Sequence, residues 1–341
     1  MSTICRGLSM RWFGRKEKPA DFRLFFATDV HGSTPTFRKF VNAANFYKVH
    51  ALVLGGDITG KMLVPVLREA GGRFSATLQE RPYVLENEEE VAAFAKHVAK
   101  MGFYTAIVTP EEYARLAEDA EARERLYREQ ARERLREWIR FAEERLGGTD
   151  VLCYITGGND DPPEILALLQ EEAREHVVPC EGRAVELAGG AYPMVSLGYS
   201  NPTPWQTPRE VEEETMAQLI AKAVEGVQDF SRAIFNFHAP PVDSTLDTCP
   251  LLDNSTDPPT VVTSGGQPVL YGAGSRAVRE AIERFQPLLS LHGHIHESRG
   301  LIQIGRTTAV NPGSEYGEGI LRGAIVTLSG DRVRSVQLTS G

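Results

Sequence analysis

The sequence predicts an α/β fold, because short apolar runs alternate along the chain with segments that carry helix signals. The runs are rich in β-branched and aromatic residues and show no alternation of polar and apolar residues, which is typical of strands buried on both faces. Each run ends in Gly, Asp, Asn or His, and α/β sheets bind ligands at the carboxyl ends of their strands. We therefore expect buried strands with a site at one sheet edge, the main runs being 24–28, 51–54, 151–155, 234–237 and 288–291.

Helix starts between these runs are marked by a capping residue, a proline and an acidic residue. Thr109-Pro110-Glu111-Glu112 places a cap, a proline at the first helical position and the glutamate of a capping box in order. The same order at 161–164, with Asp161 as the cap, and at 207–210 predicts two more helices. Between 111 and 146 the chain is dense in charge, with apolar residues on one face and two glycines at the end. This segment is expected to form one long amphipathic helix or a helix pair.

The C-terminal part of the chain contains one long loop followed by short elements. Residues 239–274 are rich in Pro, Gly, Ser, Thr and Asp and show little periodicity, which predicts a loop. Because this segment follows directly on His238, we expect it to form a wall or lid beside a site. After it we expect a helix at 275–285 and short strands at 301–304, 309–310, 324–328 and 333–338.

The composition is that of a globular protein, with 341 residues, 42% hydrophobic and 24% charged, and a formal net charge of −9. This negative balance argues against broad binding to nucleic acid or to an anionic membrane. No segment approaches the about 18 consecutive apolar residues of a transmembrane helix. Residues 1–20 are basic and lack the apolar core of a signal peptide, so we expect a flexible basic tail. The four cysteines show no CxxC spacing, so neither a zinc knuckle nor a disulfide framework is indicated, and we expect a cytoplasmic protein.

Side chains that can bind metal gather at the ends of the predicted buried strands. A mixed set of nitrogen and oxygen donors suits Mn, Fe, Zn or Ni rather than metals that prefer thiolates. Seven donors are too many for one ion, but if one carboxylate bridges, they complete two adjacent sites. Two metal ions about 3.5–4 Å apart can clamp a phosphoryl group and activate a water, so phosphoester hydrolysis is the leading hypothesis. The candidates are Asp29, His31, Asp57, Asn159, His238, His294 and His296, whereas His292 is expected to be packed or hydrogen-bonded.

The same residues stand in five ordered blocks that resemble the motifs of the calcineurin-like metallophosphoesterase superfamily. The blocks are Asp29-Val30-His31, Gly56-Asp57, Gly158-Asn159, His238-Ala239-Pro240-Pro241 and Gly293-His294-Ile295-His296. Asn311-Pro312-Gly313-Ser314 also looks like that family, and the C-terminal part resembles the prokaryotic Icc-related predicted phosphoesterases. The resemblance covers residues 23–338 in outline, apart from a helical insertion at about 61–148. We therefore expect residues 21–341 to form a single domain with insertions.

The resemblance implies a four-layer αββα sandwich, in which two mixed β-sheets pack together and helices cover their outer faces. It also implies a phosphoesterase in which a hydroxide that bridges two divalent metal ions attacks phosphorus in line. His238 and His294 would help to neutralise the phosphoryl oxygens, and the substrate would be a small-molecule phosphoester or a nucleotide. The implied ligands are Asp29, His31, Asp57 and His296 around one metal, and Asp57, Asn159, His238 and His294 around the other, with Asp57 as the bridge.

One position departs from the pattern of the family. Where the third block usually has a histidine that helps to protonate the leaving group, this sequence has Asp160. A carboxylate with an ordinary pKa of about 3.9 is ionised at pH 7 and is a poor proton donor. We therefore expect a preference for phosphodiesters with good leaving groups, such as aryl or cyclic nucleotide esters, over alkyl monoesters and phosphoproteins.

Other functions are compatible with parts of the sequence. Phosphomonoesterase or nuclease activity would use the same residues, and a relative without catalysis would use them as a metal-dependent regulatory or scaffolding module. An enzyme is favoured because only the acid of the resembled motifs is missing. Residues 55–61 also fit the GxxxxGK pattern of a P-loop, but Met62 replaces the Ser or Thr that would bind Mg²⁺. Lys61 can still approach a substrate phosphate.

Overall fold

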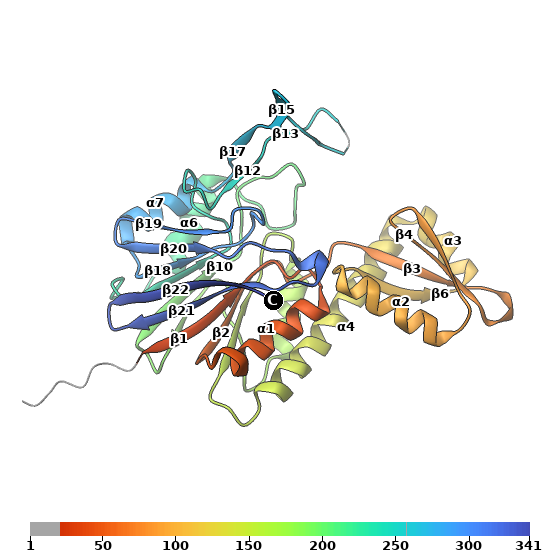
Figure 1. Cartoon of the computed structure of the whole chain (residues 1–341), viewed down its shortest axis with the longest axis horizontal. Helices are drawn as coiled ribbons and strands as arrows, with labels where there is room; N and C mark the ends of the chain where they lie inside the picture. Colours follow the sequence, from red (N-terminus) through yellow and green to blue (C-terminus); the bar gives the residue numbers. More distant parts are fainter. Residues whose placement is uncertain (1–20, 257) are drawn as a thin grey trace, which may run out of the picture.

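Two six-stranded mixed sheets form the centre of the molecule in a computed structural model, which describes residues 21–256 and 258–341 (Figure 1). The expected basic tail at 1–20 lies outside the described residues. In order across the first sheet lie β22 (Arg332–Ser340), β21 (Arg322–Ser329), β1 (Phe22–Ala27), β2 (Ala51–Gly55), β7 (Leu152–Thr156) and β8 (Val177–Pro179). The second sheet consists of β19 (Gly300–Ile304), β20 (Thr307–Asn311), β18 (Leu289–Leu291), β11 (Ile234–Phe237), β10 (Tyr192–Leu197) and β9 (Ala184–Leu187).

The central strands of both sheets run parallel, which brings their carboxyl ends to one edge. In the first sheet β1, β2, β7 and β8 are parallel neighbours. In the second sheet β10, β11, β18 and β20 are parallel neighbours. The outer strands β21, β22, β9 and β19 pair in the antiparallel sense. The loops that follow the parallel strands of the two sheets can therefore meet.

The hydrophobic core has three parts that define four layers. Phe26, Val53, Met194 and Leu289 are fully buried between the two sheets. The outer face of the first sheet packs on α1 (Thr34–Tyr47), α4 (Ala120–Leu146) and α5 (Pro163–Glu172). The outer face of the second sheet packs on α6 (Glu213–Ala223) and α7 (Arg276–Phe285). The α/β class and the four-layer αββα sandwich are thus confirmed, as are the predicted strands of both sheets and the helix at 275–285.

The segment 61–148, which the sequence indicates as helical, contains a sheet as well as helices. In the part of the chain that connects β2 to β7, four strands form a separate sheet in the order β5-β4-β3-β6. They are β3 (Leu63–Arg68), β4 (Phe74–Leu78), β5 (Arg81–Leu85) and β6 (Tyr104–Val108), with a 3-10 turn at Ala70–Gly72. One face of this sheet packs on α2 (Glu88–Lys100), and α3 (Pro110–Glu118) follows β6. The expected helix pair does form, because Asp119 separates α3 from α4.

The segment 239–274, predicted to be a loop, contains a projecting β structure that we call the β arm, residues 248–272 (Figure 1). Short antiparallel pairs hold it together. They join β12 (Thr248–Pro250) to β17 (Leu270–Gly272), β13 (Leu252–Asp253) to β14 (Thr260–Val261), and β15 (Thr263–Ser264) to β16 (Gln267–Pro268). The prediction of a long structureless loop is therefore wrong in this part.

The helix predicted to begin at Thr207 is also absent. Residues 207–210 form a turn, and α6 begins only at Glu213. The carboxylate of Glu210 accepts hydrogen bonds from the backbone N–H groups of Thr203 and Thr207, so it stabilises a loop rather than a helix end. A further 3-10 turn, Tyr316–Glu318, follows β20. None of the helices in the described part of the chain is both long and apolar enough to cross a membrane.

Candidate metal centre

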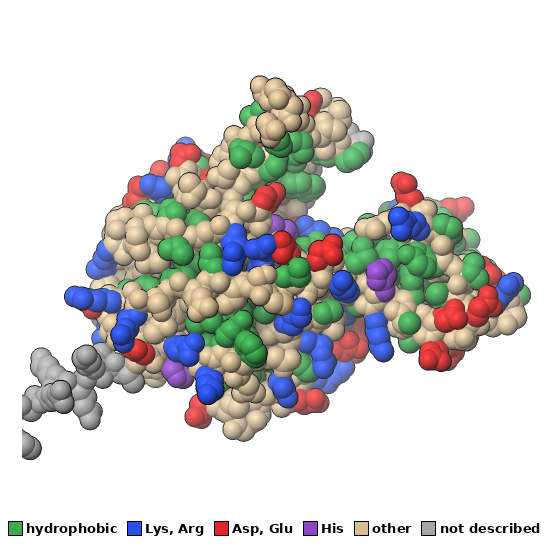
Figure 2. Space-filling view, in the orientation of Figure 1, with side chains coloured by type: hydrophobic (Ala, Val, Ile, Leu, Met, Phe, Trp, Pro, Cys, Tyr) green, Lys and Arg blue, Asp and Glu red, His purple; other side chains and the backbone are tan. Residues whose placement is uncertain are grey.

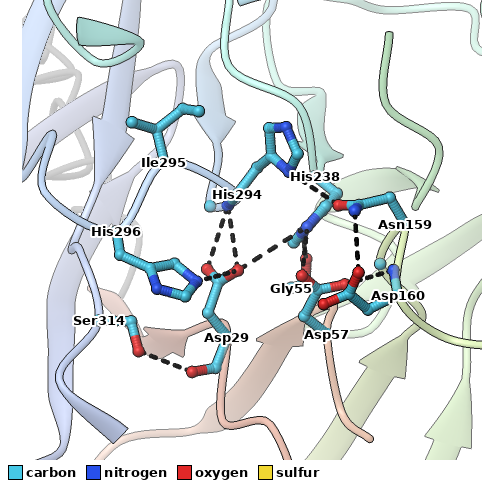
Figure 3. A network of polar contacts seen from close by, with 12 residues as sticks. Asp29, Gly55, Asp57, Asn159, Asp160, His238, His294, Ile295, His296 and Ser314 are labelled. Carbon is cyan, nitrogen blue, oxygen red and sulfur yellow. Dashed lines mark hydrogen bonds and ion pairs between the residues drawn. The ribbon is translucent and has the colours of Figure 1, made fainter. Parts of the chain in front are cut away.

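The loops after five strands, β1, β2, β7, β11 and β18, bring all seven predicted metal-binding residues together. Figure 3 labels these residues except His31. These loops come from both sheets, so the residues meet where the carboxyl ends of the parallel strands face each other. Three sets of side chains have ligand atoms within 4.8 Å of one another; one is His31, Asp57 and Asp160, and we call the other two the first and second groups. The first group is Asp29, His31 and His296, and the second is Asp57, His238 and His294. Asn159 joins the second group through its contact with His294.

Four of these residues have a left-handed backbone conformation. The φ angles are 53° for Asp29, 38° for His31, 50° for Asp57 and 67° for His294. Such conformations cost about 1–3 kcal/mol each for residues other than glycine and persist mainly at functional sites. The backbone N–H groups of Asp29 and His31 donate to the carbonyl groups of Gly56 and Asp57, which fixes the two loops against each other. The strain is therefore concentrated where the donor atoms converge.

The first group points its donor atoms at a common position. His296 Nε2 lies 3.3 Å from Asp29 Oδ1, and His31 Nε2 lies 4.0 Å from the same oxygen. The two Nε2 atoms are 3.2 Å apart. The Asp29 carboxylate also accepts the backbone N–H of His294 at 3.1 Å, which fixes its orientation.

Asp57 belongs to the second group but also lies close to the first. Its Oδ2 atom is 3.5 Å from His31 Nε2 and 3.3 Å from His238 Nε2. Its Oδ1 atom accepts the backbone N–H of Asp160 at 3.0 Å. On the far side of this group, His294 Nδ1 lies 2.7 Å from Asn159 Oδ1. Asp57 Oδ2 therefore approaches one imidazole of each group.

Two buried imidazole nitrogens support a metal at this place. His238 Nδ1 donates to the carbonyl oxygen of Gly55 at 2.9 Å, which leaves Nε2 to face Asp57. His238 Nε2 and His31 Nδ1 are buried and make no hydrogen bond to any described residue. Buried polar atoms normally have a partner, and exceptions call for an explanation such as an ion. The donor set of imidazoles and carboxylates, together with these two buried nitrogens that make no hydrogen bond, fits divalent transition metal ions.

Burial and the local charges separate the histidines into two kinds. Burial disfavours the charged form of His238, but the negative charges of Asp57 and Asp29 outweigh this effect and raise its pKa to about 10. Burial lowers the pKa of His31 to about 3 and that of His294 to about 4. For Asp29, the opposing effect of burial is exceeded by the hydrogen bond and charge of His296, and the pKa falls to about 2. In the metal-free protein His238 is thus protonated at neutral pH, whereas His31 and His294 are neutral.

Metal uptake should therefore release protons, because a metal must displace the proton of His238. Between pH 7 and 9 the apparent affinity for Mn²⁺ should rise about tenfold per pH unit for each proton released. Calorimetric titration in buffers with different ionisation enthalpies measures the number of protons. A binding heat that does not depend on the buffer would contradict this assignment. The stability of the metal-free protein should change with pH in the opposite direction to the metal affinity. The contribution of protonated His238 to the free energy of unfolding is complete below pH 6.5 and is lost as the pH rises through about 10.

Asp160 lies beside the donors and pairs with a lysine. Its Oδ2 atom is 2.9 Å from Lys61 Nζ and 3.6 Å from His31 Nδ1. Burial and the charge of Asp57 raise the pKa of Asp160 to about 6, although Lys61 acts in the opposite direction. Asp160 is therefore more easily protonated than an ordinary carboxyl group, but it remains mostly ionised at pH 7.

Asp161 does not cap a helix, as the sequence pattern predicted. The N-cap of α5 is Pro162, and no side chain caps that helix. Instead the buried Asp161 carboxylate accepts backbone N–H groups from Ile58 at 3.0 Å, Thr59 at 2.8 Å and Gly158 at 2.8 Å. It therefore joins the loop after β2 to the loop after β7 and holds Asp57 near Asn159.

Three residues that the sequence analysis did not select lie around the donors. The Tyr316 ring is 4.6 Å from the His31 ring, between centroids, but its 3-10 turn carries no motif. Thr207 Oγ1 accepts a hydrogen bond from Asn159 Nδ2 at 2.9 Å. The guanidinium of Arg209 donates to the carbonyl oxygen of Gly158 at 2.9 Å. The backbone N–H of Arg209 donates to the carbonyl oxygen of Asn159 at 3.1 Å. His292, by contrast, is buried and hydrogen-bonded to the carbonyl oxygens of Phe237 and Ala239, away from the donors.

A cavity of about 910 Å³ opens beside the metal candidates. Asp57, Asn159, His294 and His296 form part of its wall, together with Lys61. Other walls come from the loop 201–208 and from the β arm. A substrate in this cavity would therefore contact the donor groups directly.

Comparison with known proteins supports the architecture. No family model matches the chain. MJ1162, an uncharacterized protein of Methanocaldococcus jannaschii, is 32% identical over 121 residues. The aligned region is 35% of this chain and 47% of MJ1162, so the chain spans about half the length of this curated relative. TT1561 of Thermus thermophilus aligns with 94% of this chain and 99% of its own at 14% identity and a TM-score of 0.51. Another solved structure aligns over the same shares at 15% identity and a TM-score of 0.57, so both likenesses are likenesses of fold.

Proposed function

We propose that the protein is a dinuclear metal-dependent phosphoesterase that prefers phosphodiesters. The observation that carries the proposal is the convergence of seven candidate ligands into two neighbouring groups, in which Asp57 of the second group also lies 3.5 Å from His31 of the first. His238 Nε2 supports the same conclusion, because it is buried, makes no hydrogen bond to a described residue and faces the Asp57 carboxylate at 3.3 Å. The ordered motifs that resemble those of calcineurin-like metallophosphoesterases favour phosphorus as the centre of attack.

We assign the ligands to two metal ions as the motifs imply. Two divalent ions, of Mn, Fe, Zn or Ni, would supply an activated water and neutralise phosphoryl oxygens. The first would be held by Asp29, His31, Asp57 and His296, and the second by Asp57, Asn159, His238 and His294. The backbone N–H groups of His294 and Asp160 orient the carboxylates of Asp29 and Asp57. Lys61 pairs with Asp160 and lines the same cavity, so it would contact a substrate phosphoryl oxygen there.

The test compares bis(p-nitrophenyl) phosphate with p-nitrophenyl phosphate, using protein whose metal content has been measured. We expect hydrolysis that requires Mn²⁺ or a similar ion, stops when a chelator removes it, and is faster on the diester. A strong preference for p-nitrophenyl phosphate would contradict the assignment as a phosphodiesterase. Protein that takes up no transition metal and hydrolyses neither ester would instead support a scaffolding module.

Replacing Asp160 by histidine should improve hydrolysis of esters with poor leaving groups. Positioned general acids contribute about 10²–10⁴-fold, and an ionised carboxylate supplies little of this. We expect Asp160→His to raise kcat/KM for an alkyl monoester such as phosphoserine at least about tenfold. Asp160→Asn is the matched control, because it removes the carboxylate without adding an acid. Equal rates for the two variants would show that the leaving group is protonated in another way.

A further inference from the structure

The cavity beside the metal candidates has a second region that the hydrolytic groups do not account for. Its walls away from the donors are formed largely by proline, aromatic and aliphatic residues of two segments. One is the loop 201–208 with Trp205, and the other is the β arm with Leu252, Val261 and Tyr271. In Figure 2 hydrophobic side chains lie along the arm above a hollow in the surface. We propose that this region is a subsite for a flat aromatic substituent of the substrate, an inference that rests on the proposed function.

Two aromatic side chains are exposed on these walls. Trp205 has 65% of its surface exposed and Tyr271 has 39%. Large aromatic side chains are usually well buried, and exposed ones that line a cavity mark binding surfaces. Their faces can stack on a planar ring of a ligand, whereas an aliphatic chain would gain only from contact area. The subsite therefore favours an aryl group or a nucleobase.

The loop that carries Trp205 is fixed in place before any ligand binds. Glu210 accepts the backbone N–H groups of Thr203 and Thr207, both at 2.9 Å, and the Thr207 hydroxyl at 2.7 Å. Gln206, next to Trp205, has a left-handed φ of 51°, which a freely moving loop would not maintain. Little conformational entropy would thus be lost when a ring stacks on Trp205.

Hydrogen bonds connect both walls to the metal candidates. Thr207, two residues after Trp205, contacts the amide of Asn159 at 2.9 Å. The side chain of Asn201 donates to the carbonyl oxygen of Ala273, at the end of the β arm, at 3.1 Å. On the other side, Ser298 donates to the carbonyl oxygen of Thr248, which ties the arm to the turn of His294 and His296. The two aromatic side chains and the metal candidates therefore line one cavity, which one molecule with a ring and a phosphoryl group would occupy.

The charges on the cavity wall limit what else this substrate carries. Among the described residues that line the cavity, Lys61 is the one lysine or arginine, and it is paired with Asp160. Glu124 and Glu297 also line the cavity and are acidic. A second phosphate would meet no free cation among these residues and would be repelled by Glu297, whereas Glu124 is itself paired with Arg128. The substrate class is thus a phosphodiester with one phosphorus and an uncharged aromatic substituent, rather than a polyphosphate or a nucleic-acid strand.

Phosphonates test the subsite by binding alone, because they cannot be hydrolysed. Their affinities for the full-length protein loaded with Mn²⁺ are measured by calorimetry. We expect benzylphosphonate to bind at least about tenfold more tightly than methylphosphonate, as expected for stacking of one ring. Cyclohexylmethylphosphonate, which has a similar size but no flat ring, should bind more weakly than benzylphosphonate.

Variants assign this preference to the two aromatic residues. Trp205→Ala and Tyr271→Ala should each remove most of the advantage of benzylphosphonate and leave the affinity for methylphosphonate unchanged. Leu270→Ala is the matched control, because Leu270 is 60% exposed on the same arm but does not line the cavity. Equal affinities for benzyl- and methylphosphonate, or tighter binding of the cyclohexyl compound, would overturn the subsite but not the proposed function. A metal-loaded protein that binds no phosphonate at all would overturn the proposed function itself.

Discussion

Asp57→Asn is expected to abolish phosphoesterase activity and to reduce metal binding from two ions per chain to one or none. Asp57 approaches imidazoles of both groups closely, at 3.5 Å from His31 and 3.3 Å from His238, whereas Asp29 lies 3.8 Å from the nearest paired imidazole of the second group, His238. A neutral amide offers one weakly donating oxygen, so it cannot hold two cations together. Residues that merely orient metal ligands typically change activity or affinity by about 10–100-fold. Loss of the bridging ligand should therefore lower kcat/KM for bis(p-nitrophenyl) phosphate by more than about a hundredfold.

The fold should survive this replacement. Asparagine has the shape of aspartate, and its oxygen can still accept the backbone N–H of Asp160. In the metal-free protein the replacement removes the repulsion between Asp57 and Asp29 but also the attraction between Asp57 and protonated His238, so we expect a lower stability with the fold retained. The experiment combines metal analysis, circular dichroism and kinetics, with the exposed Asp331→Asn as control. A variant that keeps two ions and wild-type kcat/KM would show that Asp57 does not bridge.

The candidate ligands could be predicted from the sequence because each follows a buried strand directly. A parallel strand fixes where its carboxyl end lies, so residues such as Asp57 after β2 and His238 after β11 share an edge whatever the intervening chain does. The sheet of the insertion gave no comparable signal. Pro65 stands in the middle of β3, and a proline argues against an internal strand. The β arm consists of pairs too short to show a periodicity.

Carboxylates that connect separate segments were the hardest features to predict. Asp161 and Glu210 both stand in a sequence pattern of helix capping. In the structure Asp161 instead binds backbone groups of two other loops, and Glu210 closes its own loop. A local pattern shows that a carboxylate can accept backbone N–H groups, but not which ones are near after folding. Arg209 was missed for the same reason, because its partners Gly158 and Glu181 are distant in sequence.

Arg209→Met should have the second large effect, on stability and on metal binding together. Arg209 is 3% exposed, forms an ion pair with the largely buried Glu181, and lies over the Tyr199 ring at 4.4 Å. Removing one partner of a buried ion pair typically costs about 3–5 kcal/mol, because the other charge stays buried without compensation. The free energy of unfolding should fall by this amount in a denaturant titration. Arg332→Met, at an arginine with 86% exposure, is the matched control and should change little.

The effect on the metal centre separates a positioning role from a merely stabilising one. The Arg209 guanidinium holds the carbonyl oxygen of Gly158, next to Asn159, so its loss should loosen the Asn159 side chain within the second group of ligands, although the backbone N–H of residue 209 still donates to the Asn159 carbonyl oxygen. We expect the affinity for the second metal ion to fall about 10–100-fold in Arg209→Met. The double variant Arg209→Met, Glu181→Met removes the unpaired charge and should recover most of the stability, since buried ion pairs are often replaceable by apolar residues. If the double variant recovers the metal affinity as well, Arg209 acts on stability alone; if the affinity stays low, the residue positions Asn159.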